Sequence, residues 1–97
     1  MVRKETFRYR PRYGISRQWQ LHIYSLGFLY RDLPEYADLI DEAITAVAPE
    51  YFRAVKKCIV YGVSPRQASY DYFVSERTLQ YRIKRYYLYM YNKIKRL

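Results

Sequence analysis

Apolar residues recur at spacings of three and four between positions 36 and 47, and acidic residues occupy the positions between them. The apolar positions are Tyr36, Leu39, Ile40, Ala43, Ile44 and Val47, and the acidic ones are Glu35, Asp38, Asp41 and Glu42. This pattern predicts an amphipathic helix that ends before Pro49, with Asp32 as its N-cap and Pro34 in its first turn. No catalytic motif surrounds these carboxylates, so they indicate a solvated helix face.

A second helix is expected from Pro49 to the stop signal at Gly62, and a third starts almost immediately after it. The inward stripe of the second helix is expected to hold Phe52, Val55, Cys58 and Ile59. Ser64 then has the features of an N-cap, because Pro65 and Gln67 stand at the first and third helical positions. This Ser-x-x-Gln order predicts a capping box.

The stretch from Ser64 to Tyr86 has the pattern of a helix-turn-helix. Ala68 and Ser69 are small enough for a tight helix crossing, and Val74 can fill the space between the helices. Ser75 is the expected N-cap of the second helix, from which Leu79 and then Ile83 would face the first. Phe73 stands where many such motifs have a turn glycine, so we expect a non-standard turn.

The last helix has one apolar side and one basic side, and could continue to Leu97 because it contains no Gly or Pro. Six positions fall within an arc of about 80° at 100° per residue: Leu79, Ile83, Tyr86, Met90, Ile94 and Leu97. The residues expected to read bases are Arg77, Thr78, Gln80 and Tyr81, and those expected to contact phosphates are Arg66, Lys84 and Arg85. The alternative is an ordinary helical hairpin with a solvated basic face. The tyrosine-rich extension is expected to pack on the acidic helix or on a neighbouring subunit.

Residues 15–30 are strongly apolar, but their period is ambiguous. Trp19, Leu21 and Ile23 alternate with polar residues as in a strand, whereas Ile15, Trp19 and Leu26 have helical spacings. If the core does not cover this segment, it is a candidate oligomer contact. The preceding residues 1–14 alternate arginine with aromatic residues and contain Pro11 and Gly14, which predicts a flexible basic arm. We therefore expect one domain, residues 15–97: an all-α fold of four or five helices with a helix-turn-helix and a long C-terminal helix.

The 97 residues carry a formal charge of +9, but the charge is uneven along the chain. Residues 1–30 sum to +5, residues 31–50 to −5 and residues 51–97 to +9. Basic ends of this kind attract polyanions, which makes nucleic acid the leading partner. The acidic middle is either a solvated helix face or a contact for a basic end of another copy.

Composition argues against several other classes of protein. Cys58 is the only cysteine, so a disulfide framework and a cysteine metal site are excluded, and a lone thiol is typical of a reducing cytoplasm. His22, the only histidine, has no nearby metal-ligating residue in the sequence, and neither a metal site nor a cofactor is expected. No apolar run approaches the about 18 residues of a membrane span, and no signal-peptide segment is evident. There is no nucleophile with its base and no glycine-rich phosphate loop, so neither an enzyme nor a small-molecule substrate is expected.

From about Leu39 to Tyr86, half of the chain, the order of residues resembles PapB-like regulators of adhesin and fimbrial operons in enteric bacteria. The resemblance rests on these features: Val47 and Pro49, Ala54-Val55-Lys56, Ile59-Val60-x-Gly62, Ser64-x-Arg66-Gln67, Tyr72, Val74, Leu79, Ile83 and Arg85. It implies a bacterial, nucleoid-associated regulator that forms homo-oligomers along AT-rich double-stranded DNA near pilus promoters and can contact the minor groove. The sequence departs from the family in its basic arm, its tyrosine-rich C-terminal helix and its Glu76-Arg77-Thr78 helix start. The motif is also similar to plasmid repressors of the KorA and TrfB type, so a plasmid or phage repressor is the nearest alternative.

Two further functions stay open at this stage. One is a protein-interaction adaptor with non-specific nucleic-acid binding, which would use the acidic helix and the apolar segment from Trp19 to Leu29. The other is RNA binding through the arginine-tyrosine arm and the tyrosine-rich surface.

Overall fold

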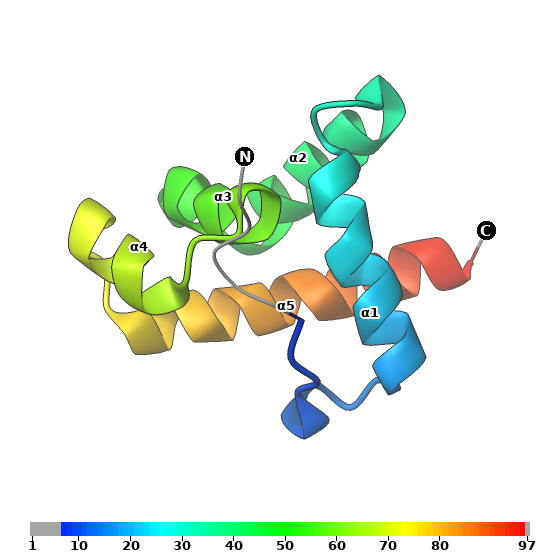
Figure 1. Ribbon diagram of the computed structural model, residues 1–97, viewed down its shortest axis with the longest axis horizontal. Coiled ribbons are helices and arrows are strands. Elements are labelled where there is room, and N and C mark those ends of the chain that lie inside the picture. Colours follow the sequence, from blue (N-terminus) through cyan, green and yellow to red (C-terminus); the bar gives the residue numbers. More distant parts are fainter. Residues whose placement is uncertain (1–6, 97) are drawn as a thin grey trace.

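The computed structural model describes residues 7–96 and is all-helical over that range. The elements are η1 (Pro11–Tyr13), α1 (Arg17–Leu26), η2 (Gly27–Leu29), α2 (Pro34–Val47), η3 (Pro49–Tyr51), α3 (Phe52–Tyr61), α4 (Pro65–Tyr72) and α5 (Glu76–Lys95). The expected all-α fold with a long C-terminal helix is confirmed. At 1.5 Å per residue α5 is roughly 30 Å long, and the other helices pack along it (Figure 1).

Apolar residues from every α-helix form one core around α5. Its fully buried members include Ile23 of α1, Ile44 of α2 and Val55 of α3, together with Leu79, Tyr86 and Met90 of α5. The inward positions expected on α5 therefore lie in the core, apart from Ile83 and Ile94, which are partly buried against it. Leu97 lies outside the described residues.

Residues 15–30 form a helix rather than a strand. Ser16 caps α1 by accepting a hydrogen bond from the Trp19 amide at 3.3 Å. Ile23 and Leu26 are buried, whereas Leu21 is exposed, because helical spacing places it on the other side of α1. The chain's own core thus covers most of the segment that was a candidate oligomer contact.

The acidic helix α2 packs against α5 of the same chain. Glu42 accepts hydrogen bonds from Tyr89 at 2.6 Å and Lys93 at 2.8 Å, and the bonds from Lys93 and Tyr89 lower the pKa of Glu42. At the C-terminal end of α2, Arg82 donates to the carbonyl of Val47 at 2.7 Å. Part of the acidic surface is therefore neutralised internally, and the tyrosine-rich extension packs on α2 as expected.

One predicted helix boundary was wrong. Pro34 occupies the first turn of α2 as expected, but the N-cap is Leu33 and no side chain caps the helix. Asp32 lies one residue too far from the helix start for its carboxylate to accept a bond from the first-turn amides.

The N-terminal segment, residues 7–15, is attached to the domain through Gln20, a fully buried polar residue of α1. Its side-chain amide accepts a hydrogen bond from the Arg10 amide at 2.9 Å and donates to the carbonyls of Arg10 at 2.8 Å and Ile15 at 2.9 Å. The predicted arm thus divides into residues 1–6, which lie outside the described residues, and a part that packs on the domain.

We expect Gln20→Ala to detach this segment, because it removes three hydrogen bonds of about 1 kcal/mol each. Trypsin should then cut the Arg12–Tyr13 bond roughly tenfold faster or more, while far-UV circular dichroism stays unchanged. Gln18→Ala, at an exposed position of the same helix, is the matched control. An unchanged cleavage rate in the Gln20 variant would contradict the anchoring role.

Candidate nucleic-acid interface

The two helices of the expected helix-turn-helix, α4 and α5, both begin at serine caps. Ser64 accepts a hydrogen bond from the Gln67 amide at 3.1 Å, and Ser75 accepts one from the Thr78 amide at 3.1 Å. The predicted caps are confirmed. The reciprocal half of the capping box is not formed, because the Gln67 side chain donates to Asp71 at 3.1 Å instead.

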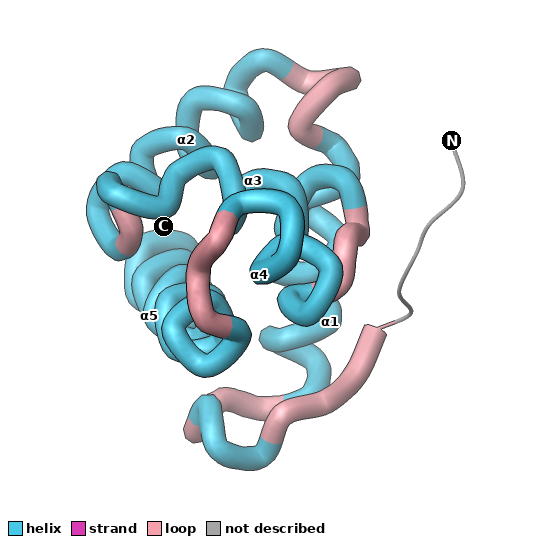
Figure 2. The backbone as a smooth tube through the Cα atoms, turned by 90° about the vertical axis from the view of Figure 1, so that its left-hand side faces the viewer, coloured by secondary structure: helices cyan, strands magenta, loops and turns pink. Residues whose placement is uncertain are grey.

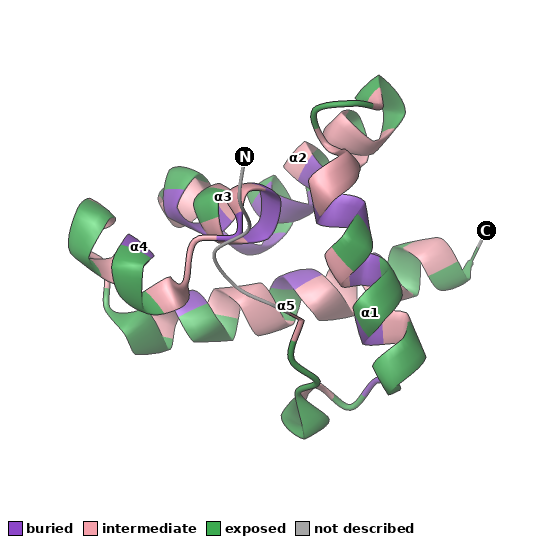
Figure 3. Cartoon of the chain, in the orientation of Figure 1, coloured by how far each residue is buried: buried purple, intermediate pink, exposed green. Residues whose placement is uncertain are grey.

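Ala68 and Leu79 are fully buried where α4 meets α5, as the crossing requires. Val74 is partly buried against the same core, consistent with its expected place between the helices. Figure 3 shows mostly exposed positions along α4, the turn and the first turn of α5. The hairpin thus has a packed inner side and an open outer side.

Phe73 ends α4 in the left-handed conformation, with φ 57° and ψ 42°. Its amide donates to the Ser69 carbonyl, as the amide of a terminating glycine commonly does. The expectation of a non-standard turn was therefore wrong about the backbone: the geometry is that of a glycine turn, and only the residue is unusual. The Phe73 side chain is 94% exposed, so packing does not offset the strain of this conformation.

We expect Phe73→Gly to raise the free energy of unfolding by about 1 kcal/mol, because glycine adopts this conformation without steric strain. Thermal unfolding should shift upward by roughly 4–8 °C for a domain of this size. Tyr70→Gly, at an exposed position inside α4, should lower stability instead. A lower melting temperature for Phe73→Gly would show that the aromatic ring stabilises the turn.

The predicted base readers lie on the first turns of α5, but they are not equally free. Arg77, Gln80 and Tyr81 are exposed, whereas Thr78 is partly buried. The Thr78 hydroxyl accepts a hydrogen bond from Ser75 at 2.7 Å and so belongs to the helix cap. Gln80 donates to Glu76 at 3.1 Å, across one exposed helical turn. Arg77 is therefore the base-reader candidate with the most available donors.

The predicted phosphate contacts also lie on this end of the molecule. Arg66 and Arg85 are exposed and Lys84 is partly so. Arg85 donates to the Tyr81 hydroxyl at 3.2 Å, which couples a phosphate candidate to a base-reader candidate. Asp71 and Glu76 share the surface and moderate its charge.

Ion pairing elsewhere leaves this surface positive. Among the described residues, the ion pairs join Lys56 to Asp41 at 3.6 Å, Arg82 to Glu50 at 3.2 Å and Lys93 to Glu42 at 2.8 Å. All of them involve the α2 to η3 region, and within the described range neither Arg66, Arg77, Lys84 nor Arg85 forms an ion pair. The hairpin and the N-terminal segment therefore both present basic side chains whose charge no ion pair within the described residues compensates.

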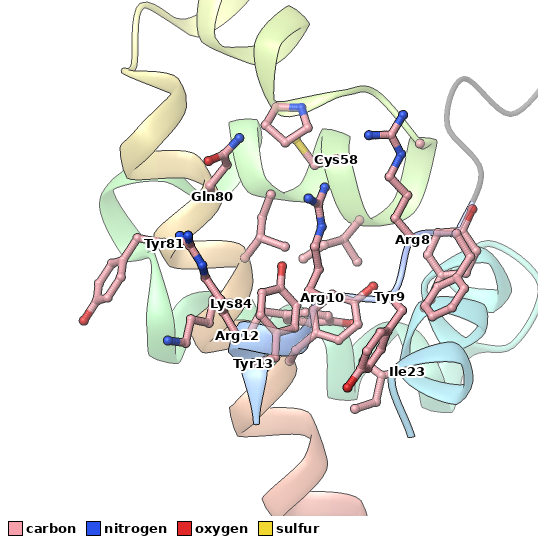
Figure 4. A pocket seen from close by; sticks show the side chains of 18 of the residues that line it. Arg8, Tyr9, Arg10, Arg12, Tyr13, Ile23, Cys58, Gln80, Tyr81 and Lys84 are labelled. Carbon is pink, nitrogen blue, oxygen red and sulfur yellow. The ribbon is translucent and has the colours of Figure 1, made fainter. Parts of the chain in front are cut away.

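The N-terminal segment forms a second wall of this site, which the sequence pattern did not indicate. The N-terminal segment lies beside α5, and the Tyr13 and Tyr87 rings are 5.2 Å apart. A cavity of about 550 Å³ separates the segment from the end of α3 and the first half of α5. Arg8, Arg10 and Arg12 line it from the N-terminal segment, and Arg77, Gln80 and Lys84 line it from α5. The Tyr81 ring points away from the N-terminal segment (Figure 4).

The floor of this cavity contains buried tyrosines. Burial raises the pKa of Tyr86 strongly, and burial followed by the neighbouring Tyr86, Tyr13 and Tyr24 hydroxyls raises that of Tyr87. Above pH 10 the unfolded chain therefore loses phenolic protons that the folded chain retains, and the free energy of unfolding falls.

We expect the melting temperature to drop between pH 9 and pH 11, and Tyr87→Phe to reduce that drop relative to the wild type. Tyr70→Phe, at an exposed position, is the control for loss of a hydroxyl. Differential scanning calorimetry at a series of pH values measures both. Identical pH slopes for Tyr87→Phe and the wild type would contradict the burial of this hydroxyl.

No group of three or more His, Cys, Asp or Glu side chains in residues 7–96 is arranged to hold a metal ion. Over the same residues, no helix combines the length and apolarity needed to cross a membrane. No family model matches the chain, and neither a curated protein nor a solved structure was found that is similar to it. Its function must therefore be inferred from the residues themselves.

Proposed function

We propose that this chain is a DNA-binding transcriptional regulator that places the α4–α5 hairpin on duplex DNA. The observation that carries the proposal is a set of basic side chains that lie on a doubly capped hairpin and form no ion pair within the described residues: Arg66, Arg77, Lys84 and Arg85. Arg77 supplies several donors for a base edge, and the other three are suited to phosphates. Figure 2 views the molecule from the end where α4 and the start of α5 lie foremost.

The N-terminal segment supports the same partner. Arg8, Arg10 and Arg12 carry three further charges beside α5, and the hydrogen bonds of Gln20 hold the Arg10 backbone in place. A segment fixed in this way can follow the DNA backbone next to the hairpin without the full entropic loss of ordering a free arm.

A single hairpin offers few base contacts, so we propose that two or more copies act together on one site. The resemblance to PapB-like regulators adds AT-rich promoter DNA of an adhesin operon as the proposed target, and a KorA-type repressor is the alternative. Regulation would follow from occupancy of the promoter, without a cofactor.

Fluorescence anisotropy with labelled DNA tests the proposal. We expect duplex DNA to bind more tightly than single strands of the same sequence, with log K falling linearly with log salt concentration. Tighter binding to single-stranded RNA would favour the RNA-binding alternative. Binding without sequence preference that disappears at moderate salt would favour the adaptor, although Glu42 and Leu26, from its two expected contact regions, are engaged within the chain.

Footprinting on the DNA upstream of the chain's own coding sequence tests for several copies. Protection of two or more regions spaced by about one helical turn of 10–10.5 base pairs is expected. A single short protected region at saturating protein would contradict the proposal of more than one copy.

A further inference from the structure

The cavity between the N-terminal segment and α5 has the size and lining of a small-molecule site. Its volume of about 550 Å³ falls within the range of roughly 300–1,000 Å³ common for ligand pockets. The walls come from three parts of the chain: residues 7–13, the end of α3 with the following loop, and the first half of α5. These walls hold several cationic side chains, and no carboxylate is among the described residues that line the cavity.

The cations line the cavity from two parts of the chain. Arg8, Arg10 and Arg12 lie on the N-terminal segment, and Arg77 and Lys84 lie on α5. None of the five forms an ion pair within the described part of the chain. A phosphate group between these two parts would receive charge-assisted hydrogen bonds from guanidinium groups, which match its geometry.

Aromatic rings line the same cavity, namely those of Phe7, Tyr9, Tyr13, Tyr24, Tyr86 and Tyr87. Such rings provide flat surfaces on which a planar base can stack, and stacking tolerates different bases. Phe7 already packs on Tyr24, and Tyr13 on Tyr87, but Tyr9 is 44% exposed. A phosphate ion alone would make no use of these rings, and an apolar ligand would leave the arginines without a counter-charge.

We propose that this cavity binds a free nucleotide, with its base among the tyrosines and its phosphate between the arginines. Because Arg77, Gln80 and Lys84 line the cavity, an occupying nucleotide engages residues that the hairpin offers to DNA. The nucleotide therefore competes with duplex DNA. The competition rests on the proposed DNA-binding function, whereas the nucleotide site does not.

Isothermal titration calorimetry of the full chain without DNA tests the site, with AMP, adenosine and inorganic phosphate as the three probes. AMP should bind about tenfold or more tightly than either of the others, because only AMP engages both the arginines and the rings. Affinity for AMP no greater than for inorganic phosphate would overturn the proposal, since it would show general attraction of anions to a basic protein.

Variants locate the binding. Tyr9→Ala removes the exposed ring of the cavity wall and should lower AMP affinity about tenfold through loss of stacking on the base. Arg10→Ala keeps the backbone bonds to Gln20 and should have a similar or larger effect, whereas Arg53→Ala, an equal charge change at an exposed position outside the cavity, should not. Equal losses for Arg10→Ala and Arg53→Ala, or wild-type affinity in Tyr9→Ala, would overturn the site.

Competition separates this inference from the proposed function. AMP should displace labelled duplex DNA from the wild type, and about tenfold more AMP should be needed with Tyr9→Ala. If AMP binds as described but no duplex binds, the site stands and the DNA-binding function fails. If duplex binds and AMP neither binds nor displaces it, the nucleotide site fails and the DNA-binding function stands.

Discussion

We expect Gly27→Ala to destabilise the fold by about 3 kcal/mol or more, the upper end of the range for overpacked core positions. Gly27 is buried where α1 passes into η2, against α3. A Cβ atom at this position would lie 2.5 Å from the backbone oxygen of Ile59 and 3.1 Å from its Cγ2. The closer of these atoms belongs to the backbone of a helix and cannot rotate away, so α1 and α3 would have to separate.

Urea unfolding followed by circular dichroism measures this loss, and Gly14→Ala is the matched control. No atom lies within 4 Å of a Cβ at Gly14, but φ there is +75°, so alanine should destabilise by only about 1 kcal/mol. If Gly27→Ala is no more destabilising than Gly14→Ala, the close packing of α1 on α3 is wrong.

We expect Arg77→Ala to lower affinity for the preferred duplex by roughly 10- to 100-fold, which corresponds to the 1–3 kcal/mol of a good bidentate base contact. Arg77 is exposed at the first turn of α5 and forms no ion pair within the described residues, so its donors are available to a base. Affinity for random duplex should fall much less, because non-specific binding depends on phosphates.

Lys84→Ala is the counterpart with the same loss of charge. It should weaken binding to preferred and random duplex about equally and reduce the salt slope by about one. Competition assays at several salt concentrations measure both variants. Equal losses for Arg77→Ala and Lys84→Ala on both DNAs would remove Arg77 from the base-reading role.

Local signals in the sequence were sufficient for the boundaries of the hairpin. Ser64, Gly62 and Ser75 act on amides or conformations within a few residues of themselves, so their roles can be predicted from spacing alone. The inward positions Leu79, Tyr86 and Met90 follow from helical period for the same reason.

Features that depend on contacts distant in sequence could not be predicted. Gln20 is buried because it bonds backbone groups ten residues earlier, and nothing in its neighbourhood marks it among apolar positions. Gly27 is required by the approach of Ile59, 32 positions later along the chain. The cavity arises only when the N-terminal segment packs beside α5. Arg77 and Lys84 could therefore be predicted as contact residues from the sequence, whereas the arginines of residues 8–12 could not be predicted to line the same cavity.

The placement of DNA on the α4–α5 hairpin is tested most directly by recording amide chemical shifts of the labelled chain as AT-rich duplex DNA is added. Shifts should concentrate in α4, the turn at Phe73, the first turns of α5 and residues 8–13. Amide shifts of α2, whose Asp41 and Glu42 form ion pairs within the chain, should stay unchanged. Shifts concentrated on α2 or on the Leu21 side of α1, or none at all with saturating duplex, would contradict the placement of DNA on the α4–α5 hairpin.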